Sequence, residues 1–140
     1  MDSLNKVKNV EYPDGSGTEV QFHKIEVADT IILNILIDGI VDTTFELPLN
    51  SQQSINILSD ISNLDEESLG IEPIILIGDY KNLKIQIVAS QIGKLFLKKL
   101  KSPKNVILSI GSKWFGKGDE STDRDFDKLM FILENTLDVI

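Results

Sequence analysis

The sequence of 140 residues contains no cysteine, one histidine (His23) and one arginine (Arg124). The absence of cysteine excludes disulfides, thiol nucleophiles, thiolate zinc sites and iron–sulfur clusters. One histidine cannot supply the histidine pair of an H-E-x-x-H zinc site. No stretch of the sequence reaches the roughly 18 apolar residues that a transmembrane helix needs. Most of the usual catalytic and metal-binding groups are therefore missing, and we expect neither a cofactor nor a membrane partner.

The net charge is negative, at −8, because the sequence has 14 basic and 22 acidic residues. Attraction to DNA or RNA is therefore not expected. A chain with 41% apolar and 26% charged residues is typical of one globular domain, here residues 1–140. The N-terminal residues MDSLNKVKNV lack the apolar stretch of a secretory signal. We expect a soluble intracellular protein, in the cytoplasm and, as a second compartment, the nucleus.

The first half of the sequence is typical of β-structure. Strands are expected over residues 7–12, 19–27, 30–37 and 40–47, with turn residues at 13–17. Within residues 19–27 the apolar side chains change from even-numbered positions (Val20 and Phe22) to odd-numbered ones (Ile25 and Val27). This change suggests a bulge or bend near His23 and Lys24. Asp38-Gly39 is a two-residue hairpin signal. Residues 49–70 are polar, with an apolar residue at every third position that favours a short helix or a packed loop.

The hairpin signal predicts a register in which Ile37 pairs with Ile40. In that register one face of residues 31–37 would share a side with Phe45 and Leu47, and two helices would cover it. The other face would then expose a stripe of aliphatic side chains. An exposed stripe of that size usually marks an interface. We therefore expect a dimer surface formed by Ile31, Leu33, Ile35, Ile37 and Ile40. The alternative is that residues 49–70 fold back and cover this stripe within the monomer.

The second half of the sequence alternates strand and helix. Strands are expected over residues 74–77 and 106–110, and an amphipathic helix over residues 85–100. Thr122 and Asp125 have the spacing of a capping box, and they precede a last amphipathic helix. The predicted fold class is α+β, a mainly antiparallel sheet of about six strands with two helices, in the order β-β-β-β-β-α-β-α.

Residues 111–117, Gly-Ser-Lys-Trp-Phe-Gly-Lys, match seven positions of a phosphate-binding P-loop. The eighth position is Gly118 instead of the Ser or Thr that holds magnesium, and Asp119 and Glu120 follow. A small nucleotide-binding hydrolase that uses this loop is therefore an alternative function. The other interpretation is a surface loop whose Trp114 and Phe115 pack on the core or on a partner. His23 has no recognisable catalytic companions, and helix capping accounts for most of the acidic residues between Asp119 and Asp127.

Basic residues are segregated along the chain. Between Tyr80 and Gly118 there are nine lysines and no acidic residue. Lysines often only solvate an exposed helix face, and a basic patch that binds an acidic protein partner is the alternative. The candidate partner-binding residues are Lys94, Lys98, Lys99, Lys101 and Lys104.

Five segments of the sequence, taken in their order along the chain, resemble the proteasome assembly chaperone 3 family. The related chaperone 4 family has a similar order of segments. The resemblance covers residues 18–48 and 71–139, and its segments are TEVQFHKIEVADTIILNILIDGIVDTTFELPL, EPIILIGD, LKIQIVASQIGKLFLKKL, NVILSIG and DFDKLMFILENTLDVI.

The resemblance implies a non-enzymatic α+β domain that pairs as a homodimer, or as a heterodimer with a related assembly chaperone. It further implies that the pair holds a proteasome α-subunit during assembly of the 20S α-ring and leaves before the particle matures. No motif marks the residues that contact the α-subunit. A generic dimeric adaptor with the same kind of fold is a third interpretation.

Overall fold

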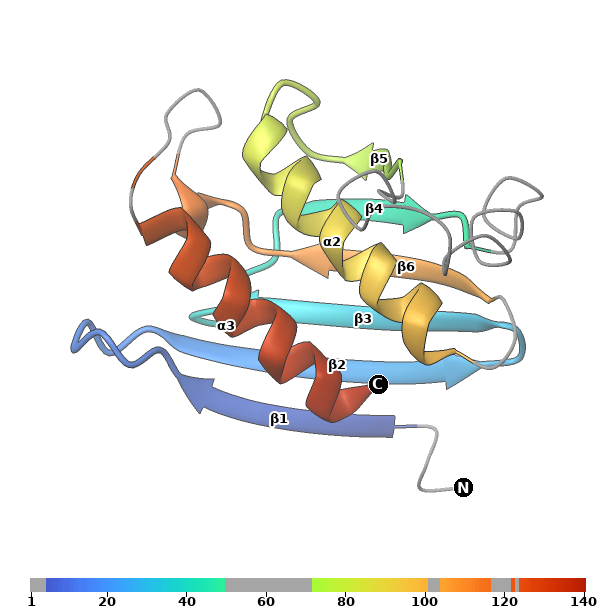
Figure 1. Cartoon of the computed structure of the whole chain (residues 1–140), viewed down its shortest axis with the longest axis horizontal. Helices are drawn as coiled ribbons and strands as arrows, with labels where there is room; N and C mark the ends of the chain where they lie inside the picture. Colours follow the sequence, from blue (N-terminus) through green and yellow to red (C-terminus); the bar gives the residue numbers. More distant parts are fainter. Residues whose placement is uncertain (1–4, 50–71, 101–103, 117–121, 123) are drawn as a thin grey trace.

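The computed structural model describes residues 5–49, 72–100, 104–116, 122 and 124–140. Six strands form one mixed sheet with the spatial order β1-β2-β3-β6-β4-β5 (Figure 1). All neighbouring strands are antiparallel except β3 and β6, which are parallel. The strands are β1 (Asn5–Glu11), β2 (Glu19–Val27), β3 (Thr30–Ile37), β4 (Thr43–Leu47), β5 (Ile74–Ile77) and β6 (Asn105–Ile110).

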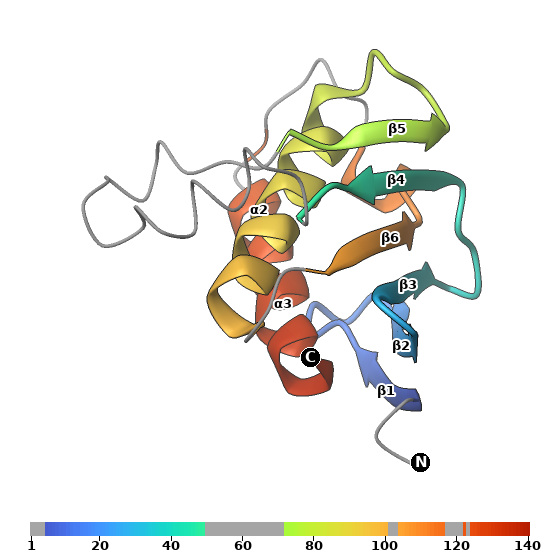
Figure 2. The ribbon, with the colours of Figure 1, turned by 90° about the vertical axis from the view of Figure 1, so that its right-hand side faces the viewer.

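Two long helices, α2 (Leu83–Lys99) and α3 (Arg124–Val139), lie on the same face of the sheet. Figure 2 shows both helices on one side and no described element on the other. The predicted α+β class and element order are confirmed. The helix or packed loop suggested within residues 49–70 lies outside the described residues except for Leu49, which is buried.

Local signals account for the ends of the elements. The Asn82 side chain accepts a hydrogen bond from the Ile85 N–H and caps α2, so residues 83–87 are helical. The Asp125 carboxylate accepts bonds from both the backbone N–H and the hydroxyl of Thr122, which is one half of the predicted capping box. The Asp125 N–H donates to the Thr122 carbonyl and not to its hydroxyl. The turn residues Asp38 and Gly39 have positive φ angles of 51° and 78°, as a two-residue hairpin turn requires.

The predicted hairpin of residues 30–47 is only partly correct. Ile37 and Ile40 do pair across the turn, but β6 inserts between β3 and β4. After the turn the chain therefore leaves the register that a hairpin would keep. The odd-numbered residues of β3 and β4 consequently point to the same side of the sheet. These residues are Ile31, Leu33, Ile35 and Ile37 of β3, and Thr43, Phe45 and Leu47 of β4. This shared side is the helix-covered core.

The predicted bulge in β2 is wrong, because its pairing with β3 runs without a shift from Val20 to Val27. The parity change in the sequence arises because Lys24 occupies a core-facing position, where it is 5% exposed. Its ammonium group donates to the Glu26 carboxylate at 2.9 Å, and Lys104 donates to the other oxygen of Glu26 at 3.1 Å. A buried cation is tolerable at this position because it is paired.

Candidate functional site: the helix-free face of the sheet

The five residues predicted to form a dimer surface do not form one face. Ile31, Leu33, Ile35 and Ile37 are buried in the core with residues of α2 and α3. Only Ile40 is exposed, at the turn. The expectation that helices leave this stripe uncovered is therefore wrong, because the insertion of β6 reverses which side of β3 shares a face with Phe45 and Leu47.

The opposite, helix-free face carries an aliphatic row. Pairing registers place Ile25 beside Ile32, and Ile32 beside Ile107, so that the row crosses β2, β3 and β6. All three side chains are half-buried. We call these residues the isoleucine row. Leu36 is a further half-buried apolar residue on this face of β3, separated from Ile32 by Asn34, and the isoleucine row ends at Glu46 on β4.

A polar row runs parallel to the isoleucine row. It consists of His23, Asn34, Ser109 and Thr44, which neighbour one another across β2, β3, β6 and β4. His23 Nε2 lies 2.8 Å from Asn5 Oδ1, and the hydroxyls of Thr44 and Ser109 are 2.9 Å apart. His23 is thus a half-buried strand residue bound to an amide, which agrees with the non-catalytic interpretation.

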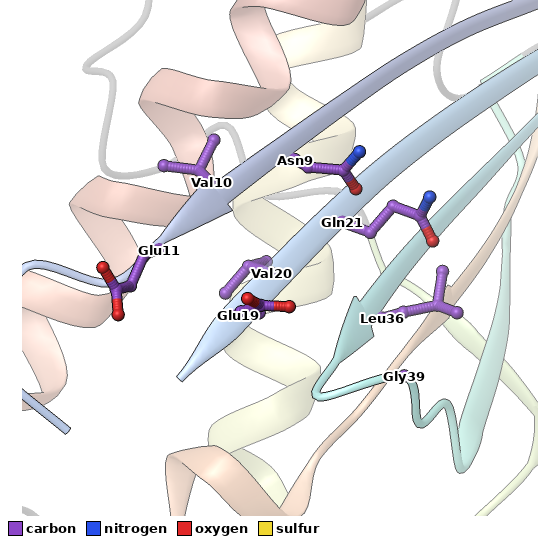
Figure 3. A pocket seen from close by; sticks show the side chains of 8 residues that line it. All are labelled: Asn9, Val10, Glu11, Glu19, Val20, Gln21, Leu36 and Gly39. Carbon is purple, nitrogen blue, oxygen red and sulfur yellow. The ribbon is translucent and has the colours of Figure 1, made fainter. Parts of the chain in front are cut away.

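A hollow of about 300 Å³ opens beside β1, β2 and the Asp38-Gly39 turn (Figure 3). Glu11 and Glu19 face each other across the two strands at its rim. Two amide side chains, two valines, one leucine and one glycine complete the lining. This combination of carboxylates and amides suits a basic or hydrogen-bonding side chain of a partner protein. The lining residues are Asn9, Val10, Glu11, Glu19, Val20, Gln21, Leu36 and Gly39.

The predicted basic patch is distributed unevenly. Lys98 and Lys99 are exposed near the end of α2, and Lys94 is half-buried one turn earlier. Lys104 is ion-paired with Glu26 inside the same chain. Lys101 lies outside the described residues. The role of these lysines in binding an acidic partner stays a prediction.

The loop that resembled a P-loop uses its backbone amides internally. The Ser112 N–H donates to the Asp42 carboxylate at 2.9 Å, and the Gly111 N–H donates to the Ile35 carbonyl. Burial alone would raise the pKa of Asp42, but these hydrogen bonds from Ser112 and one from Thr43 hold the pKa below its ordinary value. A carboxylate thus occupies the position at which a phosphate cradle would need an anion. The described residues 111–116 therefore do not form a phosphate-binding cradle.

The aromatic residues of this loop pack on the core, as the alternative interpretation predicted. Phe115 is buried, and Trp114 contacts the rings of Tyr12, Phe115 and Phe131. Lys84 also donates to the Phe115 carbonyl and pairs with Asp125, which ties the loop to both helices. The loop is thus a structural element that joins α2, α3 and β6.

The described parts of the chain contain no group of three or more acidic or histidine side chains placed to hold a metal ion. None of the described helices is long and apolar enough to cross a membrane.

The sequence interpretation expected an uncovered apolar face but assigned the wrong β3 residues to it, although one signal indicated the right ones. Ile25 and Ile107 break the polar half of the alternation in β2 and β6, where a solvated face would carry polar residues. Their register with Ile32 depends on the parallel β3–β6 pairing, which joins residues that are distant in sequence.

Comparison with known proteins gives a family and a fold. The family model for 20S proteasome chaperone assembly proteins 3 and 4 matches residues 2–136. A solved structure described as a novel chaperone complex for yeast 20S proteasome assembly has 21% sequence identity and a TM-score of 0.70, over 97% of this chain and 98% of that chain. The search of curated proteins finds no match. The protein therefore belongs to the family of 20S proteasome chaperone assembly proteins 3 and 4.

Proposed function

We propose that this protein is a non-enzymatic chaperone that pairs with a related assembly chaperone and holds a proteasome α-subunit while the 20S α-ring forms. Membership of the family carries the general role. The helix-free sheet face carries the proposal that the chain works as one half of a pair.

The isoleucine row supports pairing through this face. Full burial of one aliphatic side chain contributes about 1.5–3 kcal/mol. The row and Leu36 are half-buried in the single chain, so covering them would contribute several kcal/mol to association. The polar row and the hollow beside Glu11 and Glu19 would give the docking its register, since polar groups at interfaces contribute more to specificity than to affinity.

A heterodimer with a related chaperone fits this surface better than a chain paired with itself. The hollow beside Glu11 and Glu19 needs a basic side chain opposite it. The lysines nearest in sequence, Lys6 and Lys8 of β1, alternate with Asn9 and Glu11, and Lys8 pairs with Asp138 of α3 on the helix side. Helix α2 carries Lys94, Lys98 and Lys99 on that same side of the sheet. A partner with a lysine or arginine on its own sheet face would complement the hollow.

Contact with the α-subunit is assigned to the helix side of the molecule, where α2 presents Lys94, Lys98 and Lys99. A basic helix end attracts an acidic surface over about 10 Å at ordinary ionic strength. Because the sheet face and the helices lie on opposite sides, one chain can contact both partners at once (Figure 2).

Co-expression tests the proposal. The tagged chain is produced with a related chaperone of the family and with the proteasome α-subunits of the same source, and purified complexes are weighed by native mass spectrometry. The proposal predicts a complex of the chain, the related chaperone and one α-subunit. Recovery of the chain alone, or only with mature 20S particles, would contradict it.

A further inference from the structure

A groove of about 500 Å³ lies on the helix side of the molecule, between α3 and the turn that joins β1 to β2 (Figure 1). Its apolar walls are formed by Pro13 of the turn and by Met130 and Phe131 of α3. Tyr12, the residue that follows β1, also lines it, and we call it the Tyr12 groove. The groove shares no residue with the hollow on the helix-free face, so it is a separate surface.

Tyr12 presents a hydroxyl without a partner to this groove. The residue is only 9% exposed, and its ring packs edge-on against Trp114 and Phe131, with centroids 4.9 Å apart in both pairs. The hydroxyl forms no hydrogen bond to any described group. A buried tyrosine hydroxyl usually has such a partner. Because neighbouring rings cover the ring of Tyr12, the hydroxyl is the part of this side chain that reaches the groove.

The charge around this hydroxyl is negative. Asp14, Asp127 and Glu134 line the groove together with one cation, Arg124. Burial is the main reason why the pKa of Tyr12 lies above its ordinary value of 10.0; the charges of Asp127 and Asp14 raise that pKa further, whereas Arg124 acts to lower it. The hydroxyl is therefore neutral at ordinary pH, and its oxygen can accept a hydrogen bond from a cationic group.

Helix capping accounts for only part of this negative charge. The α3 carboxylate that bonds to Thr122 belongs to Asp125, whereas Asp127 and Glu134 are exposed and no described group bonds to either. Glu134 lies two turns after Asp127, beyond the first turn, in which a carboxylate interacts favourably with the helix dipole. With Met130 between them, both carboxylates lie on the face of α3 that lines the groove.

We infer that the Tyr12 groove binds a lysine or arginine side chain of the client α-subunit. This inference rests on the proposed function. The aliphatic part of such a side chain would pack between Pro13 and Met130. Its cationic end would donate to the Tyr12 hydroxyl and to the neighbouring carboxylates, since hydrogen bonds between charged groups are the stronger ones.

The position of the groove favours the α-subunit as its partner. The related chaperone is assigned to the helix-free face, so a groove on the helix side stays accessible in the pair (Figure 2). Three carboxylates beside one guanidinium attract a basic group. This contact is opposite in sign to the one proposed for α2, and the two contacts together would therefore fix the orientation of the α-subunit.

Binding of the co-purified α-subunit to the preformed chaperone pair tests the groove by surface plasmon resonance. The double variant Asp127→Asn, Glu134→Gln removes two charges and should weaken binding by about 10-fold. Tyr12→Phe keeps the ring and removes the hydroxyl, and a loss of about 3-fold is expected. The matched control for the single variant Asp127→Asn is Asp138→Asn on the same helix, whose carboxylate pairs with Lys8. This control should leave the affinity unchanged.

Two small probes test the chemistry of the groove without the α-subunit. N-acetyl-arginine amide and N-acetyl-citrulline amide have nearly the same shape, but only the arginine probe is charged. Backbone amide shifts of the isotope-labelled chain, within the chaperone pair, are followed by NMR as each probe is added. Larger shifts at Asp127, Met130 and Glu134 are expected with the arginine probe, and the difference between the probes should disappear in the double variant.

Circular dichroism establishes that each variant is folded before binding is measured. Unchanged or tighter binding of the α-subunit by the folded double variant would overturn the inference, and so would equal shifts from the two probes. In both cases the proposed function stands, because the wild-type pair still binds the α-subunit. A wild-type pair that binds no α-subunit would contradict the proposed function and this inference together.

Discussion

Ile37 and Ile40 exchange two backbone hydrogen bonds of 3.0 Å across the Asp38-Gly39 turn, yet the strands on either side of that turn are not neighbours. Only this one pair of residues has hairpin geometry. The chain then moves away from β3, because β6 lies between β3 and β4. The end of β6 lies directly against this turn: a Cβ on Gly111 would meet the Ile40 carbonyl oxygen at 2.7 Å and the Ile37 side chain at 3.0 Å.

Gly111→Ala should therefore destabilise the fold, since the closest atom belongs to the backbone and cannot rotate away. Overpacking of this kind costs about 1–3 kcal/mol. Urea denaturation followed by circular dichroism measures the loss, and Gly111→Val should lose more than Gly111→Ala. Equal stability of all three proteins would show that the turn does not pack against Gly111 in solution.

Local signals predicted most of the fold. The Asp38-Gly39 turn, the Thr122–Asp125 contact and the two amphipathic helices each depend on residues close in sequence. The face assignment failed because it depends on β6, whose partner in β3 lies 75 residues earlier in the chain, as in the pair Leu33 and Leu108. Nothing in the alternation of residues 30–47 reveals a strand inserted from elsewhere.

The candidate site was less predictable than the fold, for the same physical reason. The isoleucine row exists only when β2, β3 and β6 are aligned. The alternation of buried and exposed residues in β2 was also misinterpreted, because Lys24 points into the core. A lysine at a core position suggests that the strand has changed face, unless its ion pair with Glu26 is known. The α2 lysines were predicted from the distribution of charge along the sequence, and their role in binding an acidic partner stays a prediction.

Neighbouring residues of β3 test the corrected face assignment. Leu33 is fully buried, so Leu33→Glu places a charge in the core at a cost of several kcal/mol, against a total stability of about 5–15 kcal/mol. Ile32 lies on the helix-free face, and Ile32→Glu should change stability by about 1 kcal/mol or less in the isolated chain. Thermal denaturation followed by circular dichroism compares them. A folded Leu33→Glu protein beside an unfolded Ile32→Glu protein would restore the original face assignment.

Glu26 should give the protein a specific acid sensitivity. The hydrogen bond from Lys24 is the main reason why the pKa of Glu26 lies below its ordinary value of 4.5, although the partial burial of Glu26 acts to raise that pKa. The folded state therefore binds this proton more weakly than the unfolded state does. The stabilisation is complete above about pH 4.5 and is lost as the pH falls through the lowered pKa.

Glu26→Gln removes this charge and should cost about 1.5–3 kcal/mol near pH 7, because Lys24 stays buried without its counter-charge. The stability difference between wild type and Glu26→Gln should shrink below pH 4.5, as measured by urea denaturation across a pH series. A difference that stays constant from pH 7 to pH 3 would contradict this role.

The α2 lysines should act on the rate of association more than on final affinity. Replacing Lys94 and Lys98 with glutamate is expected to slow binding of an acidic α-subunit several-fold and to flatten its dependence on salt. Stopped-flow fluorescence at several salt concentrations measures both effects. The single variants Lys94→Glu and Lys98→Glu are compared with Lys6→Glu on β1, which changes the charge by the same amount away from α2. Identical association rates in all proteins would leave these lysines with only a solvating role.

The central claim is that one chain joins a related chaperone through its helix-free sheet face and carries an α-subunit at the same time. Native mass spectrometry of co-expressed complexes tests it most directly, with the wild type beside an Ile32→Glu, Ile107→Glu double variant. The account predicts a three-component complex for the wild type and a folded chain without the related chaperone for the double variant. A wild-type chain recovered alone, or a double variant that still assembles all three components, would contradict it.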